Sequence, residues 1–217
     1  MSVRAKELYR EITGRKYIYL VLLTAALLLM LFIDVSVGPA RLLIKEVYQS
    51  IFLPSSATPA TRVIVWLIRL PVALMAIVVG ASLAVAGAEM QTILDNPLAS
   101  PYTLGVSAGA GFGAALAMVL GVGVIPYGQE FLVPVNAFFF SMLSCFLVYF
   151  IGKAKGVSKG TMILTGIAIL FLFHAALALL QYLASEEELQ SVVFWLFGSL
   201  MKATWMKLGV TVAVLFI

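Results

Sequence analysis

The sequence predicts an all-α protein, a polytopic bundle of transmembrane helices. Hydrophobic residues make up 63% of the 217 residues and charged residues only 11%, against about 45–50% and about 25% in soluble domains. The mean hydropathy is +1.09. The apolar residues form long runs that contain Gly and Pro, without the short alternating blocks of an outer-membrane barrel. A helical membrane protein is therefore expected.

Basic residues precede the first apolar run, which extends from Tyr17 to Ile33. They are Arg4, Lys6, Arg10, Arg15 and Lys16. Since basic residues favour the cytoplasmic side, residues 1–16 are expected to be a cytoplasmic segment. A signal peptide is the alternative interpretation. The apolar run is longer than usual for that class and no A-x-A site follows it, which favours a retained helix.

The interval from Asp34 to Arg62 is expected outside the membrane. Pro39 marks a possible helix start there, and Leu42, Leu43, Val47 and Ile51 suggest an amphipathic helix at the interface. Apolar sequence resumes from Val63 to Leu94 and forms the second predicted span.

Small residues follow a helical spacing on both sides of a polar turn, Asp95–Pro101. Before the turn, Ala76, Gly80, Ala84 and Ala88 recur at every fourth residue, with Gly87 beside them. After it, Gly105, Gly109 and Gly113 repeat the spacing within a predicted span from Tyr102 to Val124. Such faces let helix backbones approach closely. They predict close packing or a backbone-lined translocation path, with the turn as a hinge-like constriction.

Later segments continue the alternation of spans and loops. Pro126–Glu130 is expected to be an external loop, and spans are expected over Phe131–Ile151 and Gly160–Ala184. The loop between those spans carries Lys153, Lys155 and Lys159 and should be cytoplasmic. Residues 185–188 are expected to begin a solvated external helix that continues over Leu189–Leu200. Residues 17–217 then form a single transmembrane domain of about five complete spans and part of a sixth.

The sequence contains few residues of the kinds that catalyse reactions or bind cofactors. There is one histidine, His174, and one cysteine, Cys145, and no nucleotide-binding motif. We expect a transport subunit and no enzyme, with no cofactor, metal site or nucleic acid partner. Glu89 and His174 lie in apolar segments and have two interpretations. They are snorkelling and packing residues, or they carry protons in a secondary transporter.

The stretch RLPVALMAIVVGASLAVAGAEMQTILDNPLASPYTLGVSAGAGFGAAL resembles the signature region of the permease subunits of type II ABC importers. These import vitamin B12, haem and ferric siderophores. The later blocks GVSKGTMILTGIAI and LQSVVFWLFGSL are similar to further segments of that family, in the same order. The resemblance implies the N-terminal part of a ten-helix permease, truncated at its C-terminus. It also implies location in the cytoplasmic (inner) membrane.

The resemblance further implies partners and site residues. The partners are two ABC ATPase subunits, an external solute-binding protein, a second permease copy or a paralogous permease, and membrane lipid. Asn96, Pro97 and Leu98 match the family's cytoplasmic gate, whose second element corresponds to Ser158 and Lys159. The family can have a small hydroxyl residue where this chain has Lys159, and Glu89 also replaces an apolar residue.

Arg69 matches an external arginine that docks the binding protein. The second arginine of that motif is Val72 here, so Arg62 is expected to assist.

The leading hypothesis is the permease of an ATP-driven importer of a ferric siderophore, haem or corrinoid. The alternative is a proton-coupled secondary transporter that uses Glu89 and His174.

Overall fold

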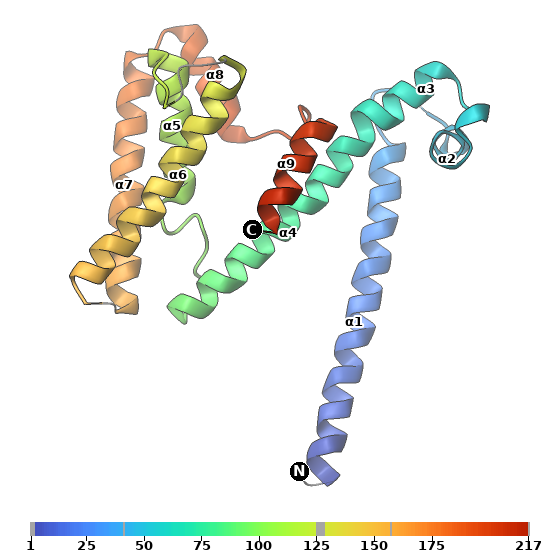
Figure 1. The fold of residues 1–217 in the computed structure, drawn as a ribbon, viewed down its shortest axis with the longest axis horizontal. Coiled ribbons are helices and arrows are strands. Elements are labelled where there is room, and N and C mark those ends of the chain that lie inside the picture. The colour runs from blue at the N-terminus through green and yellow to red at the C-terminus, as the bar shows by residue number, and fades with distance from the viewer. Residues whose placement is uncertain (1–2, 41, 125–128, 157, 217) are drawn as a thin grey trace. The chain divides into compact units, whose positions relative to one another are not determined.

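The computed structural model describes residues 3–40, 42–124, 129–156 and 158–216, with side chains from residue 13 onward except at 129 and 130. Every regular element in these ranges is helical (Figure 1). The chain divides into two compact units, one of residues 1–80 and 200–217 and the other of residues 81–199. The all-helical prediction is confirmed.

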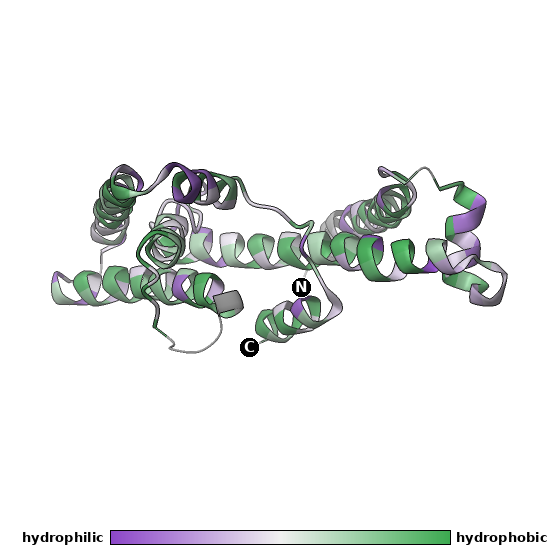
Figure 2. Ribbon diagram, turned by 90° about the horizontal axis from the view of Figure 1, so that it is seen from above, coloured by the Kyte–Doolittle hydropathy of each residue, from purple (hydrophilic) through white to green (hydrophobic). Residues whose placement is uncertain are grey.

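Four helical stretches of the described residues are long and apolar enough to cross a membrane. They are Thr13–Ser36, Pro59–Leu94, Phe131–Ala154 and Lys159–Leu183. Apolar residues run along nearly the whole length of these helices (Figure 2). The large side chains from Tyr17 to Leu23 are all at least 60% exposed. A helix that is apolar on every side is expected in contact with lipid.

The first unit contains α1 (Val3–Ser36), α2 (Ile44–Phe52), the 3-10 turn η1 (Pro54–Ser56), α3 (Pro59–Val63), the π-helical turn η2 (Ile64–Arg69), the first part of α4 (Leu70–Leu94) and α9 (Trp205–Leu215). Val35, Val47, Val65 and Ala73 form its buried core. The predicted amphipathic helix exists as α2, but it begins at Ile44 and not at Pro39. The Glu46 carboxylate accepts the Leu43 N–H at 2.8 Å and closes that helix start.

The helix that leads into α4 is wound more widely just before Pro71. Proline has no N–H to donate to Leu67 and its ring crowds that carbonyl, so α-helical hydrogen bonding is interrupted there. The Leu70 N–H bonds to the Val65 carbonyl, which is the five-residue spacing of η2. This turn carries Arg69 on the side that faces the interior of the unit, where Arg69 is 9% exposed.

Two tryptophans connect α9 to the rest of the first unit. The Trp205 indole N–H donates to the Trp66 carbonyl at 2.8 Å, and the Trp66 indole N–H donates to the Ser50 carbonyl at 2.9 Å. The two indole rings lie 6.3 Å apart between centroids. α9 is too short to span a membrane.

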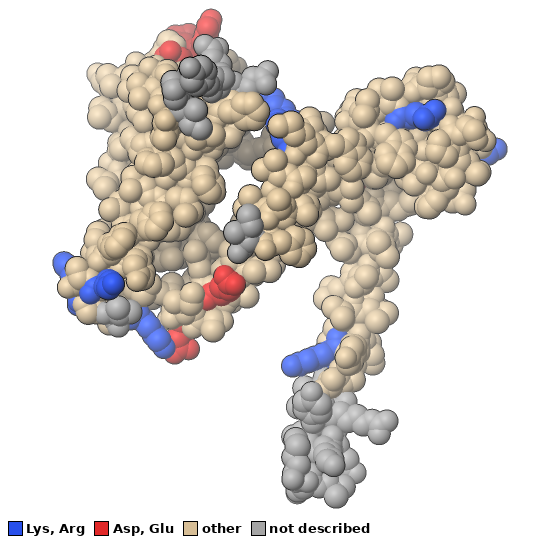
Figure 3. All heavy atoms as spheres, in the orientation of Figure 1, with Lys and Arg blue, Asp and Glu red and all other residues tan. Residues whose placement is uncertain are grey.

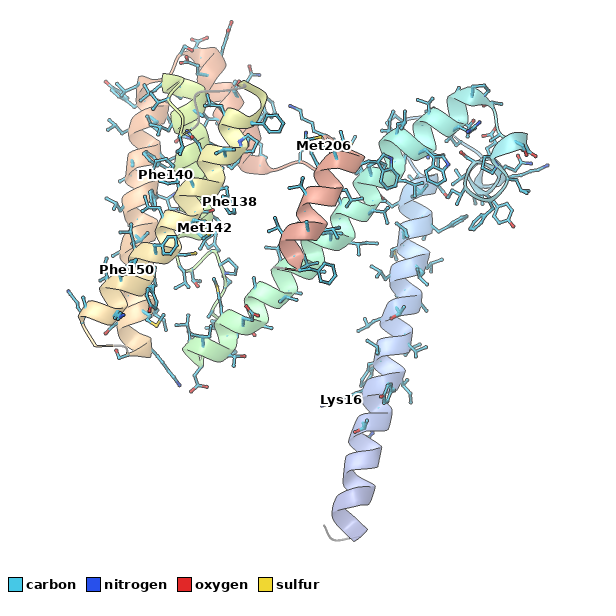
Figure 4. The ribbon with its side chains drawn as sticks, in the orientation of Figure 1. Lys16, Phe138, Phe140, Met142, Phe150 and Met206 are labelled. Carbon is cyan, nitrogen blue, oxygen red and sulfur yellow. The ribbon has the colours of Figure 1, made fainter. Side chains whose placement is uncertain are left out.

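The second unit contains the rest of α4, α5 (Val106–Leu120), α6 (Gln129–Ala154), α7 (Lys159–Leu183) and α8 (Glu186–Phe197). Its aromatic centre joins three helices: Phe140 of α6 lies 5.0 Å from the Phe112 ring of α5 and 6.3 Å from the Phe173 ring of α7. Figure 4 labels Phe140 among these side chains. Phe138 and Phe150, also labelled on α6, are 61% and 59% exposed.

Two glycines of α5, Gly109 and Gly113, lie in close contact with α6. A Cβ atom added at Gly109 would lie 2.6 Å from the Phe140 carbonyl oxygen, and one at Gly113 would lie 2.4 Å from that of Asn136. Only glycine lets the α5 backbone approach α6 this closely.

The predicted span from Tyr102 to Val124 is shorter than expected, because α5 covers only residues 106–120. Gly105 and Gly121 flank it in left-handed conformations, with φ of 75° and 63°, which end an α-helix on either side. The segment beyond Gly121 is held by Asn136, whose amide donates to the Val122 carbonyl at 2.7 Å and accepts the Val124 N–H at 3.0 Å.

The predicted loop at 152–159 is shorter than expected, since α6 continues to Ala154 and α7 begins at Lys159. Of the predicted loop at 126–130, residues 126–128 lie outside the described residues, and Gln129 already begins α6. The predicted acidic helix start is confirmed. Ser185 accepts the Glu188 N–H, and the Glu188 carboxylate accepts the Ser185 N–H at 2.9 Å.

Candidate functional site

The segment from Asp95 to Gly105 is non-helical and extends alongside α7. At one end, the Asp95 carboxylate lies 2.7 Å from the Lys159 ammonium, at the first residue of α7. At the other end, a Cβ atom on Gly105 would lie 2.9 Å from the Leu170 backbone nitrogen. An α-helix rises about 16 Å between residues 159 and 170. The segment therefore follows α7 over roughly half of the ~30 Å hydrocarbon thickness.

Local hydrogen bonds replace the missing helical ones along this segment. The Asn96 side-chain oxygen accepts the Leu98 N–H at 2.9 Å, an Asx turn. The Thr103 hydroxyl donates to the Ser100 carbonyl at 2.8 Å and accepts the Ser100 N–H at 3.1 Å. Because unpaired backbone groups are costly in hydrocarbon, irregular backbone at this depth must be covered by protein or line a water-filled cavity.

Gly166 of α7 also allows this segment to pack closely against the helix. At Gly166 an added Cβ atom would lie 3.0 Å from the Leu104 Cα atom and 3.2 Å from the Thr103 carbonyl oxygen. From α6, the Ser144 hydroxyl donates to the Leu104 carbonyl at 3.0 Å. One side of the segment is thus fixed to α6 and α7.

Other residues of the segment face outward. Leu98 is 81% exposed and Tyr102 is 59% exposed, whereas Ala99 is only 4% exposed. Leu98 is the most exposed large apolar residue between α4 and α5. The predicted gate turn therefore presents an apolar side chain that its own unit does not cover.

The two predicted gate elements lie together. Ser158 caps α7: its hydroxyl accepts the Thr161 N–H at 3.1 Å and lies 2.7 Å from the Thr161 hydroxyl. Lys159 reaches the Asp95 carboxylate directly before Asn96. The hydrogen bond and charge of Lys159 lower the pKa of Asp95. Asp95 was not predicted as a site residue, because sequence spacing does not reveal contact across 64 positions.

Three lysines lie at one end of the second unit, beside Asp95, and three glutamates lie at the other end. Lys153, Lys155 and Lys159 lie where α6 meets α7, and Glu186, Glu187 and Glu188 begin α8 after the far end of α7. Figure 3 shows the corresponding blue and red groups at opposite ends of this unit. This distribution fits a cytoplasmic α6–α7 loop.

The two arginines expected to dock a partner have different surroundings in the first unit. The Arg69 guanidinium donates to the carbonyls of Val35 at 2.8 Å, Ser36 at 2.9 Å and Ala40. Arg62 is exposed, beside a shallow pocket of about 340 Å³ formed with Pro59, Val63, Trp66 and Leu67. Arg62 is therefore the accessible cation, while Arg69 is held inside the unit.

The remaining predicted residues are surface residues within the described chain. Glu89 and His174 are exposed, and neither makes a side-chain hydrogen bond or ion pair with another described residue. Ala84 is exposed, and no described atom lies within 4 Å of a Cβ atom added at Gly80 or Gly87. The small-residue face of α4 is thus open, unlike that of α5.

Residues 26–217 match the model of the FecCD transport family. The chain is 34% identical to an ABC transporter permease protein of Methanocaldococcus jannaschii over 95% of this chain and 61% of that one. It is 33% identical to the vitamin B12 import permease of Serratia proteamaculans, covering 72% and 46% of the two chains. The molybdate import permease of Haemophilus influenzae is 35% identical, with 86% and 55% covered.

A solved structure of a metal-chelate type ABC transporter in an inward-facing conformation is also similar. The TM-score is 0.71 at 32% identity, covering 88% of this chain and 56% of that one. The chain thus spans 46% to 61% of the lengths of these three relatives.

Proposed function

The chain belongs to the FecCD transport family, and we propose that its full-length protein is the membrane permease of an ATP-driven importer. The observation that supports this most strongly is the match of residues 26–217 to that family, and the irregular backbone of Asp95–Gly105 beside α7 supports a transport pathway. Broken helices at membrane depth are typical of transport pathways, where exposed backbone lines the route of the substrate. The partners are two ABC ATPase subunits, an external solute-binding protein and a second permease.

The cytoplasmic gate in this proposal consists of Asn96, Pro97, Leu98, Ser158 and Lys159. Leu98 is 81% exposed. It closes the path by apolar contact with the corresponding turn of the second permease. The open face of α4 around Gly80, Ala84 and Gly87 lines the path or packs against that second copy.

The N-terminus and the α6–α7 loop are cytoplasmic in this proposal, and the protein resides in the cytoplasmic membrane. The basic residues before Tyr17 and those at 153–159 support this orientation. Arg62 then faces outside, where acidic residues of the binding protein can reach it. Arg69 can take part in docking only by giving up its carbonyl partners.

The proposed substrate is a metal chelate such as a ferric siderophore, haem or a corrinoid. Relatives named for vitamin B12 import and hemin transport, and the similarity to a metal-chelate transporter, support this class. A large cargo needs a wide path with few charges so that it can leave again, and the pathway segment Asn96–Gly105 contains no charged residue.

The test is uptake by the full-length protein reconstituted in vesicles with its ATPase and binding protein. We expect ATP-dependent uptake of one member of a panel of vitamin B12, haem, ferric siderophores and molybdate. Uptake driven by a proton gradient without the ATPase would contradict the proposal and favour a secondary transporter.

A further inference from the structure

We propose that Asp95 is a positioning residue whose ion pair with Lys159 holds the turn after α4 against the start of α7. The inference rests on the proposed function, because it assigns the pair a role in keeping the gate closed. The carboxylate and ammonium are 2.7 Å apart and belong to segments 64 residues apart in the sequence.

The placement of both charges is unfavourable for their own helices. Asp95 directly follows the C-terminus of α4, and Lys159 is the first residue of α7. A helix dipole favours the opposite arrangement, with cations at the C-terminus and anions at the N-terminus. Helix stabilisation therefore does not explain these charges, whereas their mutual contact does.

The backbone at Asp95 directs this contact. Asp95 has a φ of 47°, a left-handed conformation that aspartate tolerates better than most residues. The residue ends α4 and turns the chain into the Asx turn of Asn96. A contact fixed at Asp95 consequently fixes the start of the turn that carries Leu98.

The pair is suited to repeated opening. The Lys159 and Asp95 side chains are 59% and 77% exposed, and exposed ion pairs are weak and screened by salt. Such a contact can hold one arrangement of the gate and still break when ATP-driven movement separates α4 from α7. A buried pair would resist that separation.

The test uses charge reversal in the full-length permease assembled with its ATPase and binding protein. The variants are D95K, K159D and the double reversal D95K/K159D, and K155Q in the same loop is the control. Each single reversal should raise ATP hydrolysis without substrate by about two- to fivefold, the effect of losing an exposed ion pair. The double reversal should return it toward the wild-type rate.

A second readout follows the gate directly. In a Cys145→Ala background, Leu98→Cys should react faster with a thiol reagent from the cytoplasmic side when either single reversal is present, and at the original rate in the double reversal. If the reversals fail to assemble, D95N and K159Q are measured in the same way.

Single reversals that behave like K155Q, or a double reversal no better than the singles, would overturn the inference while ATP-dependent uptake by the wild type still supports the proposed function. A wild-type complex without such uptake would instead overturn the proposed function. Thiol reactivity can still report the ion pair in that case.

Discussion

At the residue scale, buried polar side chains of this protein mainly hold irregular backbone. Asn136 holds the segment after α5, and Arg69 holds the last residues of α1 and the segment after them. In both cases one side chain forms hydrogen bonds with several backbone groups that have no partner within a helix. These bonds remove the cost of unpaired backbone groups in an apolar environment.

Replacing Asn136 with Ala should destabilise the protein by about 1–3 kcal/mol, because the Val122 carbonyl and the Val124 N–H lose their partner. Thermal unfolding in detergent measures the effect. Ser141→Ala on the same helix is the matched control, since the Ser141 hydroxyl donates to the Phe138 carbonyl of its own turn. Equal melting temperatures for the two variants would contradict this role.

Arg62→Ala and Arg69→Ala should separate docking from stability. The first should weaken binding-protein affinity by about tenfold or less, as expected for a charge at the edge of an interface, and leave the melting temperature unchanged. The second should lower the melting temperature, because three carbonyls lose their donor. Titration of the binding protein and a melting curve test both expectations. Reversed effects would assign docking to Arg69.

The start of α8 should respond to acid. Hydrogen bonds from the Ser185 backbone and side chain lower the pKa of Glu188. A lowered pKa in the folded state means that the stabilisation is present above the unfolded pKa of about 4.3, and is lost as the pH falls through the folded value. Carboxyl NMR should show that the titration midpoint of Glu188 rises when Ser185 is replaced with Ala, because one of the two hydrogen bonds that lower its pKa is lost. An unchanged midpoint would contradict the capping box.

At the element scale, the sequence predicted helices that are marked by capping residues or by long apolar runs. It did not predict where the helices are interrupted. The capping pattern of Ser185 and Glu188 and the apolar length of α7 are local properties, and both predictions are confirmed. The early end of α5 depends on left-handed glycines at 105 and 121. Gly105 is pressed against Leu170, a contact that sequence spacing does not encode. The Asp95–Lys159 contact was unpredictable for the same reason.

The α5–α6 contact should be the least tolerant of added volume. Gly113→Val would push side-chain atoms into the Asn136 carbonyl and should cost about 1–3 kcal/mol or more by overpacking. Gly209→Ala in α9 is the control, because no described atom lies within 4 Å of its added Cβ atom and alanine favours helix. Melting temperatures compare the two, and a tolerated valine would contradict the close packing of α5 on α6.

At the scale of the whole molecule, the family assignment follows from the sequence, whereas the pathway follows from combining it with the structure. The signature block around Asn96–Pro97–Leu98 indicated the family. Composition indicated only a membrane protein. The sequence predicted a polar turn over Asp95–Pro101, but hydropathy assigned Tyr102–Gly105 to an ordinary span, whereas the structure continues the non-helical backbone to Gly105. In the proposed function, Asp95–Gly105 lines a water-filled path through the membrane.

Cysteine scanning of residues 96–104 in the full-length complex, in a Cys145→Ala background, tests that claim most directly. We expect a membrane-impermeant thiol reagent to label Leu98→Cys and Tyr102→Cys from the cytoplasmic side and to block uptake. Ala99→Cys, which is buried, and Phe138→Cys, which faces lipid in this account, should stay unlabelled. Absence of labelling throughout 96–104, or labelling equal to that of Phe138→Cys, would contradict the account.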